Sequence, residues 1–213
     1  PLSEYKKIFL ACNKYSKKNI LITDVGSAKR DTITKINRIK RKDINWISSH
    51  PIAGSEVSGP LNGNENLFVN KWSVIIKQKK SQTKEMKKIL KFWKLLGSKT
   101  VTMDADQHDK IFAITSHLPH LIAYNLILTA TNFKISNKDN VLRFSAGGLR
   151  DFSRIAASNE IMWRDIFFNN KSNMLKVIDL LIKNLKIFKS DIKSNRKNLK
   201  NKLKNLKKVR QKI

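Results

Sequence analysis

The first 104 residues alternate between helical and strand-like patterns, and this alternation most constrains the fold. A helical pattern over 1–15 precedes a short, continuous apolar run at 19–24, which is typical of a buried strand. A second helix reaching residue 40 and a second strand at 44–49 follow. This helix–strand–helix–strand order predicts a parallel sheet of the doubly wound type.

The strand signals continue to residue 103 and then stop. We expect strands at 67–69 and 72–76, an amphipathic helix at 81–96 that Gly97 ends, and a last strand at 99–103. The part of the chain up to this point is therefore expected to be an α/β domain.

Everything after Ala105 is expected to be helical. The expected helices span 105–133, 149–157, 160–168 and 172–213, the last as one long tail with a continuous apolar stripe. Such a stripe usually pairs with another helix, often from a second subunit. We therefore expect an α/β domain at 1–104 and an all-α domain at 105–213.

The charge of the chain is strongly positive. It has 44 Lys and Arg against 16 Asp and Glu, a formal net charge of +28. This balance is typical of nucleic-acid binding. However, the lysines are spread over the whole chain, and arginines, which dominate base recognition, are few outside 147–164. We favour a lysine-rich solvated surface and keep a basic, helical nucleic-acid-binding protein as the alternative function.

The cysteine content and the apolar runs bear on the compartment. Cys12 is the single cysteine, which excludes an internal disulfide and is typical of a reducing compartment, so we expect a cytoplasmic protein. No apolar run is expected to approach the roughly 20 residues that span a bilayer. The chain begins with Pro1 rather than Met, which we interpret as a fragment that is incomplete at its N-terminus.

A histidine and a serine follow two consecutive predicted strands. His50 opens the polar loop 50–59, and open α/β sheets place their ligands at such strand ends. Ser27 follows the preceding strand, so its hydroxyl is expected beside the His50 imidazole, which accepts protons near neutrality. On the pattern alone, a structural histidine and a serine that caps the next helix explain these residues equally well.

Two further histidines share one face of a predicted helix. His117 and His120 lie three residues apart, with Pro119 between them. A metal pair lacks a third ligand at suitable spacing, so we expect no metal site and favour substrate contact or helix packing.

A glycine pair leads into a helix that carries charged residues. Gly147 and Gly148 precede Asp151 and Arg154, and the planar guanidinium of Arg154 is suited to a carboxylate. An Asp151–Arg154 pair within the helix is the simpler interpretation. Trp163, farther along, is typical of a core residue.

The glycine fingerprint of dinucleotide binding is not in this sequence. The seven glycines do not form the G-x-G-x-x-G pattern that holds a pyrophosphate after a first strand. Either this sheet binds no dinucleotide, or an N-terminal part outside the sequence carries the fingerprint.

Taken in order, six stretches resemble the prephenate dehydrogenase family, which includes cyclohexadienyl and arogenate dehydrogenases. These stretches are 24–29, 50–59, 67–70, 108–109, 116–120 and 147–165. The resemblance implies a Rossmann-type domain with a partial parallel sheet, followed by a helical dimerisation domain like the C-terminal domain of 6-phosphogluconate dehydrogenase. The implied reaction is oxidative decarboxylation of prephenate or arogenate, with hydride transfer to NAD or NADP, in tyrosine biosynthesis.

The resemblance also implies roles for individual residues. His50 is the catalytic histidine that accepts the proton of the ring 4-hydroxyl, Ser27 orients it near the nicotinamide, and Arg154 binds a substrate carboxylate. The positions that line or support the substrate pocket are His117, His120, Glu56, Asp151 and Trp163, and those at the cofactor are Asp24, Gly26 and Ser27. A homodimer through the helical domain is implied. Without the glycine fingerprint, we expect weak or no dehydrogenase activity from these 213 residues alone, and an inactive dimerisation fragment is a further alternative.

Overall fold

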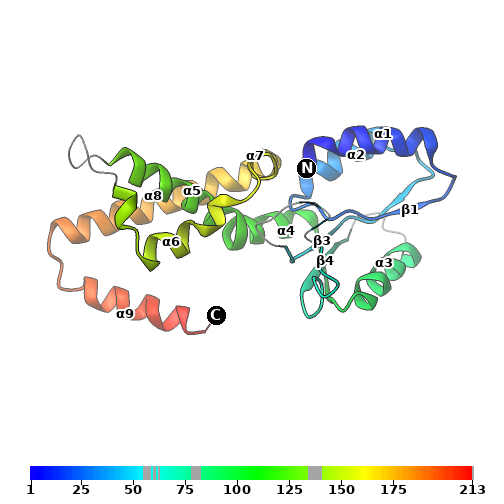
Figure 1. Ribbon diagram of the computed structural model, residues 1–213. Coiled ribbons are helices and arrows are strands. Elements are labelled where there is room, and N and C mark those ends of the chain that lie inside the picture. The colour runs from blue at the N-terminus through cyan, green and yellow to red at the C-terminus, as the bar shows by residue number, and fades with distance from the viewer. Residues whose placement is uncertain (55–58, 60, 62, 78–82, 134–140, 213) are drawn as a thin grey trace. The chain divides into compact units, whose positions relative to one another are not determined.

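The computed structural model describes residues 1–54, 59, 61, 63–77, 83–133 and 141–212. These residues form two compact units, Pro1–Met174 and Leu175–Ile213. The first unit holds all the described strands and the helices that pack on them (Figure 1).

The α/β part of the first unit follows most of the predicted order of elements. It consists of a 3-10 turn (Leu2–Glu4), α1 (Tyr5–Tyr15), β1 (Leu21–Ile22), α2 (Arg30–Ile39), β2 (Asn45–Trp46), β3 (Ser49–Pro51), β4 (Trp72–Ile76), α3 (Thr83–Leu95) and β5 (Lys99–Met103). The single strand expected at 44–49 is wrong, because it is two short strands in different sheets, and His50, expected to open a loop, lies within the second of them. The expected strand at 67–69 is wrong, because these residues form hydrogen-bonded turns in which the Val69 N–H donates to the Asn66 carbonyl. Gly97 ends α3 at a φ of +81°, a conformation that glycine adopts without strain.

The strands pair in a mixed rather than a wholly parallel arrangement. β1 and β2 are parallel, β3 and β4 are antiparallel, and β4 and β5 are parallel. Parallel neighbours need a crossover of a dozen or more residues, usually a helix. Among the residues described between β3 and β4, bends, turns and a 3-10 residue at Leu61 stand in place of such an α-helix. β4 runs antiparallel to β3, and the described strands form two sheets, β1–β2 and β3–β4–β5. The predicted α/β class holds with these differences.

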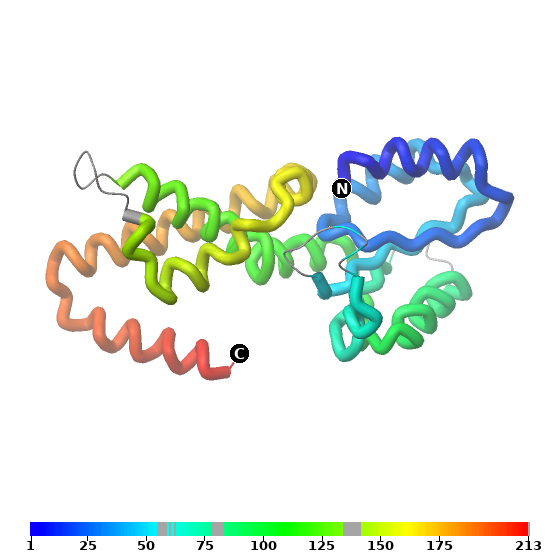
Figure 2. Tube along the Cα trace, in the orientation of Figure 1, coloured from blue at the N-terminus to red at the C-terminus, as the bar shows by residue number. Residues whose placement is uncertain are grey.

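Helices cover both faces of the strands (Figures 1 and 2). Phe9 of α1 and Ile36 of α2 belong to one core cluster with Trp46 of β2. The next residue, Ile47, belongs to a different cluster with Trp93 of α3. Adjacent strand residues point to opposite faces. The pattern therefore places α1 and α2 on one face and α3 on the other.

The predicted helix over 105–133 is interrupted near its middle. α4 (Ala105–Phe112) passes into a π-helical turn (Ala113–His117) and then into α5 (Leu118–Asn132). Pro119 has no N–H to donate to the carbonyl four residues earlier, so the regular hydrogen-bond register cannot run through it. A π-helical turn just before the proline accommodates the missing bond.

The rest of the first unit is helical, as predicted, but the helix expected over 149–157 begins at Gly147 and becomes a 3-10 turn after Ser153. A 3-10 turn (Val141–Phe144), α6 (Gly147–Ser153), a second 3-10 turn (Arg154–Ala157) and α7 (Glu160–Asn169) precede α8 (Lys171–Lys193), which continues into the second unit. Asn159 caps α7 as expected, since its side chain accepts the N–H of Met162 at 2.8 Å.

The C-terminal tail is two helices, so the single helix expected over 172–213 is wrong. α8 ends at Lys193, and α9 spans Leu199–Arg210. Asn195 lies between them with a φ of +46°, and asparagine tolerates this left-handed conformation better than most residues. Asp191 pairs with both Arg196 and Lys202, so one carboxylate joins the two helices across the break.

The run Ala105–Asn132 corrects one expectation from the sequence. It is the single described helical run that is long and apolar enough to cross a membrane by length and composition alone, with a mean hydropathy of 1.4 in its most apolar window. However, its buried Asp109 accepts hydrogen bonds from the backbone of α2, and its His108 side chain contacts β3. These contacts are those of a helix packed within a folded domain.

We expect Ile75 to be a main determinant of stability, because its side chain in β4 is fully buried. Ile75→Ala leaves a cavity in the core and should lower the free energy of unfolding by about 2–5 kcal/mol. Urea unfolding measures this loss, with Leu61→Ala as the control because Leu61 is 98% exposed. Equal stability of the two variants would show that β4 is not the core strand.

Candidate active site

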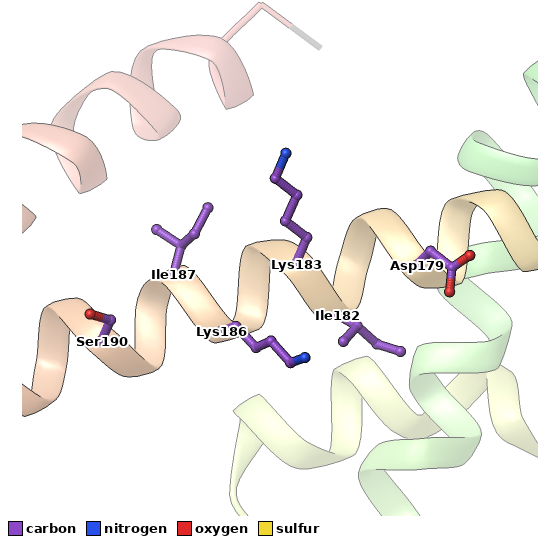
Figure 3. Close-up of a pocket in the computed structure, with 6 residues that line it drawn as sticks. All are labelled: Asp179, Ile182, Lys183, Lys186, Ile187 and Ser190. Atoms are coloured by element: carbon purple, nitrogen blue, oxygen red, sulfur yellow. The ribbon is translucent and has the colours of Figure 1, made fainter.

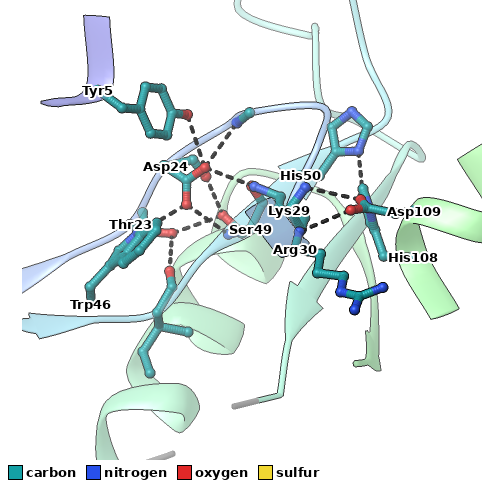
Figure 4. A network of polar contacts seen from close by, with 12 residues as sticks. Tyr5, Thr23, Asp24, Lys29, Arg30, Trp46, Ser49, His50, His108 and Asp109 are labelled. Atoms are coloured by element: carbon teal, nitrogen blue, oxygen red, sulfur yellow. Dashed lines mark hydrogen bonds and ion pairs between the residues drawn. The ribbon is translucent and has the colours of Figure 1, made fainter. Parts of the chain in front are cut away.

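His50 occupies the middle of β3 and is buried, with 8% of its surface exposed. Its Nδ1 atom lies 2.8 Å from Nε2 of His108, which α4 supplies (Figure 4). The Phe112 ring, one turn along α4, packs against both imidazoles with centroid distances of 4.9 Å and 4.4 Å. One nitrogen of His50 is therefore engaged by another histidine inside an apolar surround.

The second nitrogen of His108 is also engaged. Its Nδ1 atom lies 2.8 Å from Oδ1 of Asp109. The Asp109 carboxylate also accepts the backbone N–H groups of Lys29 and Arg30, each at 2.9 Å. Asp109 therefore caps the N-terminus of α2 from another helix. The expectation that Ser27 caps this helix is wrong, because Lys29 is the N-cap residue and makes no side-chain cap.

A buried ion pair lies behind these residues. The Lys29 ammonium is 2.7 Å from Oδ2 of Asp24 and donates to the Ser49 carbonyl at 2.5 Å. Asp24 also accepts hydrogen bonds from the Tyr5 hydroxyl at 2.9 Å and from the Trp46 indole at 3.0 Å (Figure 4). Burial of a charged pair is costly unless its remaining hydrogen-bonding capacity is satisfied, and these donors satisfy it.

Asp24 and Gly26 were predicted as cofactor residues, and the structure shows how they shape the loop after β1. The Gly26 N–H donates to Oδ2 of Asp24 at 3.0 Å. A Cβ atom at Gly26 would approach the Tyr5 hydroxyl to 2.6 Å, so a larger residue does not fit without movement. Their contact with a cofactor stays a prediction.

A second group of predicted site residues gathers on α5 and α7. The His120 ring stacks on Trp163 with centroids 3.6 Å apart, and His117 meets the same indole edge-on at 6.2 Å. His117 is fully buried, and its Nδ1 atom lies 3.1 Å from the side-chain nitrogen of Asn170. Within the described ranges, its Nε2 atom makes no hydrogen bond. Asn170 also donates to the Asp109 carbonyl, which links the two groups.

The other predicted site residues are placed differently. The hydrogen bond to His50 comes from His108 rather than from Ser27, whose backbone faces His117 instead. Asp151 and Arg154 are exposed in α6 and the 3-10 turn after it, and the contacts described above do not reach them. Glu56 lies outside the described residues.

Burial and nearby charge keep the site histidines neutral. Burial, and then the positive charge of Lys29, hold the pKa of His50 well below its ordinary value of 6.5. Burial lowers the pKa of His117 to about 4, although Asp109 opposes this shift. Burial also lowers the pKa of His108, again against the effect of Asp109. At neutral pH, all three imidazoles are therefore uncharged and able to accept a proton.

Sequence reasoning gave no role to four residues of this network: Lys29, His108, Asp109 and Asn170. A signal exists for two of them, because His108 and Asp109 are adjacent ionisable residues in a largely apolar helical run. Within the parts of the chain that the structure describes, no three His, Cys, Asp or Glu side chains gather as a metal site.

A separate hollow of about 540 Å³ lies along α8 in the second unit. Its lining residues are Asp179, Ile182, Lys183, Lys186, Ile187 and Ser190 (Figure 3). Lys183 and Ile187 point to one side of the helix, whereas Ile182 and Lys186 point to the other (Figure 3). The hollow is therefore open helix surface, and the buried histidines remain the candidate for chemistry.

An α/β part, a helical part and a neutral, buried histidine in β3 are together typical of nucleotide-dependent oxidoreductases. Comparison with protein families makes the class specific. Residues 1–102 match the nucleotide-binding domain of prephenate dehydrogenase, and residues 104–208 match its dimerization domain. The chain belongs to the prephenate dehydrogenase family.

Individual relatives agree with the family. A cyclohexadienyl dehydrogenase of Zymomonas mobilis is 34% identical over 178 residues, and a prephenate dehydrogenase of Bacillus subtilis is 32% identical over 166 residues. These matches cover 84% and 78% of this chain, but only 60% and 44% of the two relatives. The chain thus spans less than two thirds of their length.

A solved structure supports both the family and the fold. The crystal structure of prephenate dehydrogenase from Aquifex aeolicus aligns with all of this chain at a TM-score of 0.92 and 31% identity, and 75% of that structure is covered. A second structure of that enzyme, in complex with hydroxyphenyl propionate and NAD+, also aligns at a TM-score of 0.92.

The depressed pKa of His117 predicts a dependence of stability on pH. Since the unfolded chain binds this proton near pH 6.5 and the folded chain only near pH 4, the stabilisation is complete above pH 6.5 and is lost as the pH falls through this window. The loss approaches about 1.4 kcal/mol per pH unit for each such histidine. Urea unfolding between pH 4 and 6.5 should show that the free energy of unfolding falls less steeply with decreasing pH in His117→Gln than in the parent. An equal pH dependence in the two proteins would contradict a lowered pKa of His117.

Proposed function

We propose that this chain carries the catalytic histidine and the substrate-binding part of a prephenate dehydrogenase. The reaction is oxidative decarboxylation of prephenate or arogenate with NAD or NADP, in tyrosine biosynthesis. The observation that carries this proposal is His50, a neutral, buried imidazole in the short strand β3 of a chain of this family. Its Nδ1 atom is already engaged by His108, which leaves Nε2 for a substrate.

In this reaction, His50 takes one proton from the substrate and later returns it. His50 accepts the proton of the ring 4-hydroxyl as hydride leaves the same carbon, and the carbon–oxygen bond becomes a carbonyl. Loss of CO₂ from the opposite ring carbon supplies the electron pair that makes the ring aromatic, and the phenolate oxygen takes the proton back. Prephenate and the oxidised cofactor thus give 4-hydroxyphenylpyruvate, CO₂ and the reduced cofactor. NAD or NADP, when bound, accepts the hydride.

We assign the remaining tasks to the other predicted site residues. Arg154 binds a substrate carboxylate, because its planar guanidinium matches a carboxylate in two parallel hydrogen bonds. His117 offers a buried Nε2 atom without a hydrogen bond in the described chain, so it is suited to contact a polar group of the substrate. The other positions that line or support the pocket are His120, Glu56, Asp151 and Trp163.

The described residues fit the nicotinamide end of a dinucleotide. Asp24, Gly26 and Ser27 form the loop after β1, and the Asp24 carboxylate contacts the Ser49 N–H at 3.3 Å, one residue before His50. We assign these three residues to hold the cofactor beside His50. The sequence has no G-x-G-x-x-G pattern, so no residue here is assigned to the pyrophosphate.

We assign these tasks to two domains that divide near residue 104. Residues 1–104 form the nucleotide-binding domain, and residues 105–213 form the helical substrate and dimerisation domain. The two family matches, which end at 102 and begin at 104, support this division. The helical domain packs on the first through α4 and α7, where the Ser3 N–H donates to Asp165 at 2.8 Å.

We further propose a cytoplasmic homodimer that forms through the helical domain. Only 22% of the most apolar window in Ala105–Asn132 is buried within one chain, so an apolar surface is left for a second copy to cover. On α8, Leu180 and Leu185 are also more than half exposed. A single cysteine and the tyrosine-biosynthetic role support the cytoplasm.

Two variants test the assigned roles by their different kinetics. His50→Asn removes the proton acceptor and should lower kcat by about 10²–10⁴-fold with little change in KM. Arg154→Ala removes ground-state binding and should chiefly raise KM. The measurement follows reduced cofactor with prephenate and with arogenate, and it uses the chain together with any residues that precede it in its gene.

Each variant can contradict one of the two assigned roles, proton acceptance by His50 or carboxylate binding by Arg154. Turnover of His50→Asn at the parent rate would remove His50 as the base, and an unchanged KM in Arg154→Ala would remove the carboxylate contact. Preference for one substrate in the parent enzyme would decide between prephenate and arogenate.

The dimer is tested by mass in solution. Light scattering on the purified protein should give twice the 24.6 kDa of one chain. Leu185→Asp places a charge on the exposed apolar side of α8, so it should shift the mass toward one chain, whereas His50→Asn should not. A parent protein of single-chain mass at micromolar concentration would contradict the proposal.

A further inference from the structure

We propose that His108 and Asp109 are positioning residues that hold His50 in the one tautomer able to accept the substrate proton, and that they share the positive charge this proton creates. The inference rests on the proposed role of His50 as the base. It follows from a continuous chain of three side chains, Asp109–His108–His50, joined by two contacts of 2.8 Å each.

Asp109 sets the direction of the hydrogen bonds in the Asp109–His108–His50 network, that is, which atom donates in each. Two backbone N–H groups, from Lys29 and Arg30, already point at the two oxygens of its carboxylate. An ionised carboxylate is an acceptor only, so the ring nitrogen 2.8 Å away must be the donor. Nδ1 of His108 therefore carries the proton of that imidazole.

The state of His108 then fixes the state of His50. A neutral imidazole has one N–H, so a proton on Nδ1 leaves Nε2 of His108 as an acceptor. The Nδ1 atom of His50 at 2.8 Å must therefore be the donor in the second contact. This leaves Nε2 of His50 without a proton, which is the state that a general base needs.

The surroundings hold this chain in place. His108 and Asp109 are 0% and 1% exposed. α4 is fixed at its start by Asp104, whose side chain accepts the Gln107 N–H at 2.8 Å, and Asn170 donates to the Asp109 carbonyl at 2.8 Å. Tautomer, ring orientation and distance are therefore set before any substrate binds, as in the carboxylate–imidazole arrangements of other enzymes.

The same hydrogen-bonded network also offsets the positive charge that His50 acquires when it takes a proton. The titratable groups that act on its imidazole are Lys29, His108 and His117, and none of them is negative. A proton taken on Nε2 would place a cation near the Lys29 ammonium. Movement of the Nδ1 proton from His50 to Nε2 of His108 transfers that charge to an imidazole that contacts the Asp109 carboxylate. The shift reverses when the phenolate oxygen takes its proton back, so no proton is gained or lost.

Asp109→Asn tests the inference without removing a side chain. The amide has one acceptor oxygen where the carboxylate has two, although three N–H groups, of Lys29, Arg30 and His108, point at this side chain. It also carries no negative charge, so it neither fixes the proton on Nδ1 of His108 as strongly nor stabilises the cation that forms when His50 takes the substrate proton. The corresponding change in serine proteases costs about 10⁴ in kcat, and we expect a loss of about 10²–10⁴-fold with little change in KM.

Two further variants separate positioning from structure. Asp109→Glu keeps a carboxylate and should recover part of the lost kcat, which a purely structural role does not require. Asp106→Asn is the matched control on the same helix, because the Asp106 carboxylate is 45% exposed and pairs with the surface cations Arg30 and Lys110, so its kcat should be that of the parent. All variants are assayed as the whole chain with any preceding residues, beside the urea midpoint and the Kd for NAD.

The pH profile gives a readout that loss of folding does not move. Activity requires neutral His50, so kcat should fall on the acid side in the parent. Without the negative charge of Asp109, the imidazoles are harder to protonate, so the acid limb of the residual activity in Asp109→Asn should move to lower pH. An unmoved limb together with parent-like kcat would overturn the inference.

The inference fails separately from the proposed function. If His50→Asn is inactive while Asp109→Asn and His108→Asn both turn over at the parent rate, His50 is the base and the positioning role is wrong. If His50→Asn is itself fully active, the proposed function is wrong. Should Asp109→Asn have a lowered urea midpoint, His108→Asn decides, with the same kcat loss expected and parent-like kcat overturning the proposal.

Discussion

The hydrogen bonds between the Asp109 carboxylate and the N-terminus of α2 are the contact on which the rest of the site depends. They place α4 against the loop after β1, which brings His108 to His50. Free N–H groups at a helix start carry partial positive charge and favour a carboxylate. One side chain thus joins the helical and α/β parts of the first unit and also contacts the imidazole that reaches His50.

The Asp24–Lys29 pair gives the same region its electrostatic character. Lys29 is fully buried, and its charge is offset by Asp24 and by the Ser49 carbonyl. Because ionised groups in an apolar surround act over longer range than in water, this ammonium helps to keep His50 uncharged. The pair thus has two effects. It anchors the loop after β1, and it disfavours a cation on the neighbouring strand.

Local pattern predicted most helices and strands, because apolar spacing and glycine or asparagine boundaries depend on neighbours in the chain. It failed where the deciding contact is polar and lies outside the helix or strand in question. Ser27 looked like the cap of α2, but the cap is Asp109, about 80 residues away. His108 is likewise far from His50 in the sequence, so local pattern did not identify it as the neighbour of His50. The single tail helix was wrong because the pairing of Asp191 with Lys202 leaves no trace in apolar spacing.

The π-helical turn at Ala113–His117 also sets which residues the long helical run directs toward the site. An α-helix turns by roughly 100° per residue, so one extra residue in a turn rotates everything after it by that amount. His108 faces β3, whereas His117 and His120 meet Trp163 from α7. The π-helical turn therefore changes the rotation of α5 about the helix axis relative to α4, so that the two helices contact different neighbours. Loss of a single residue there would misdirect an entire helix while leaving its composition intact.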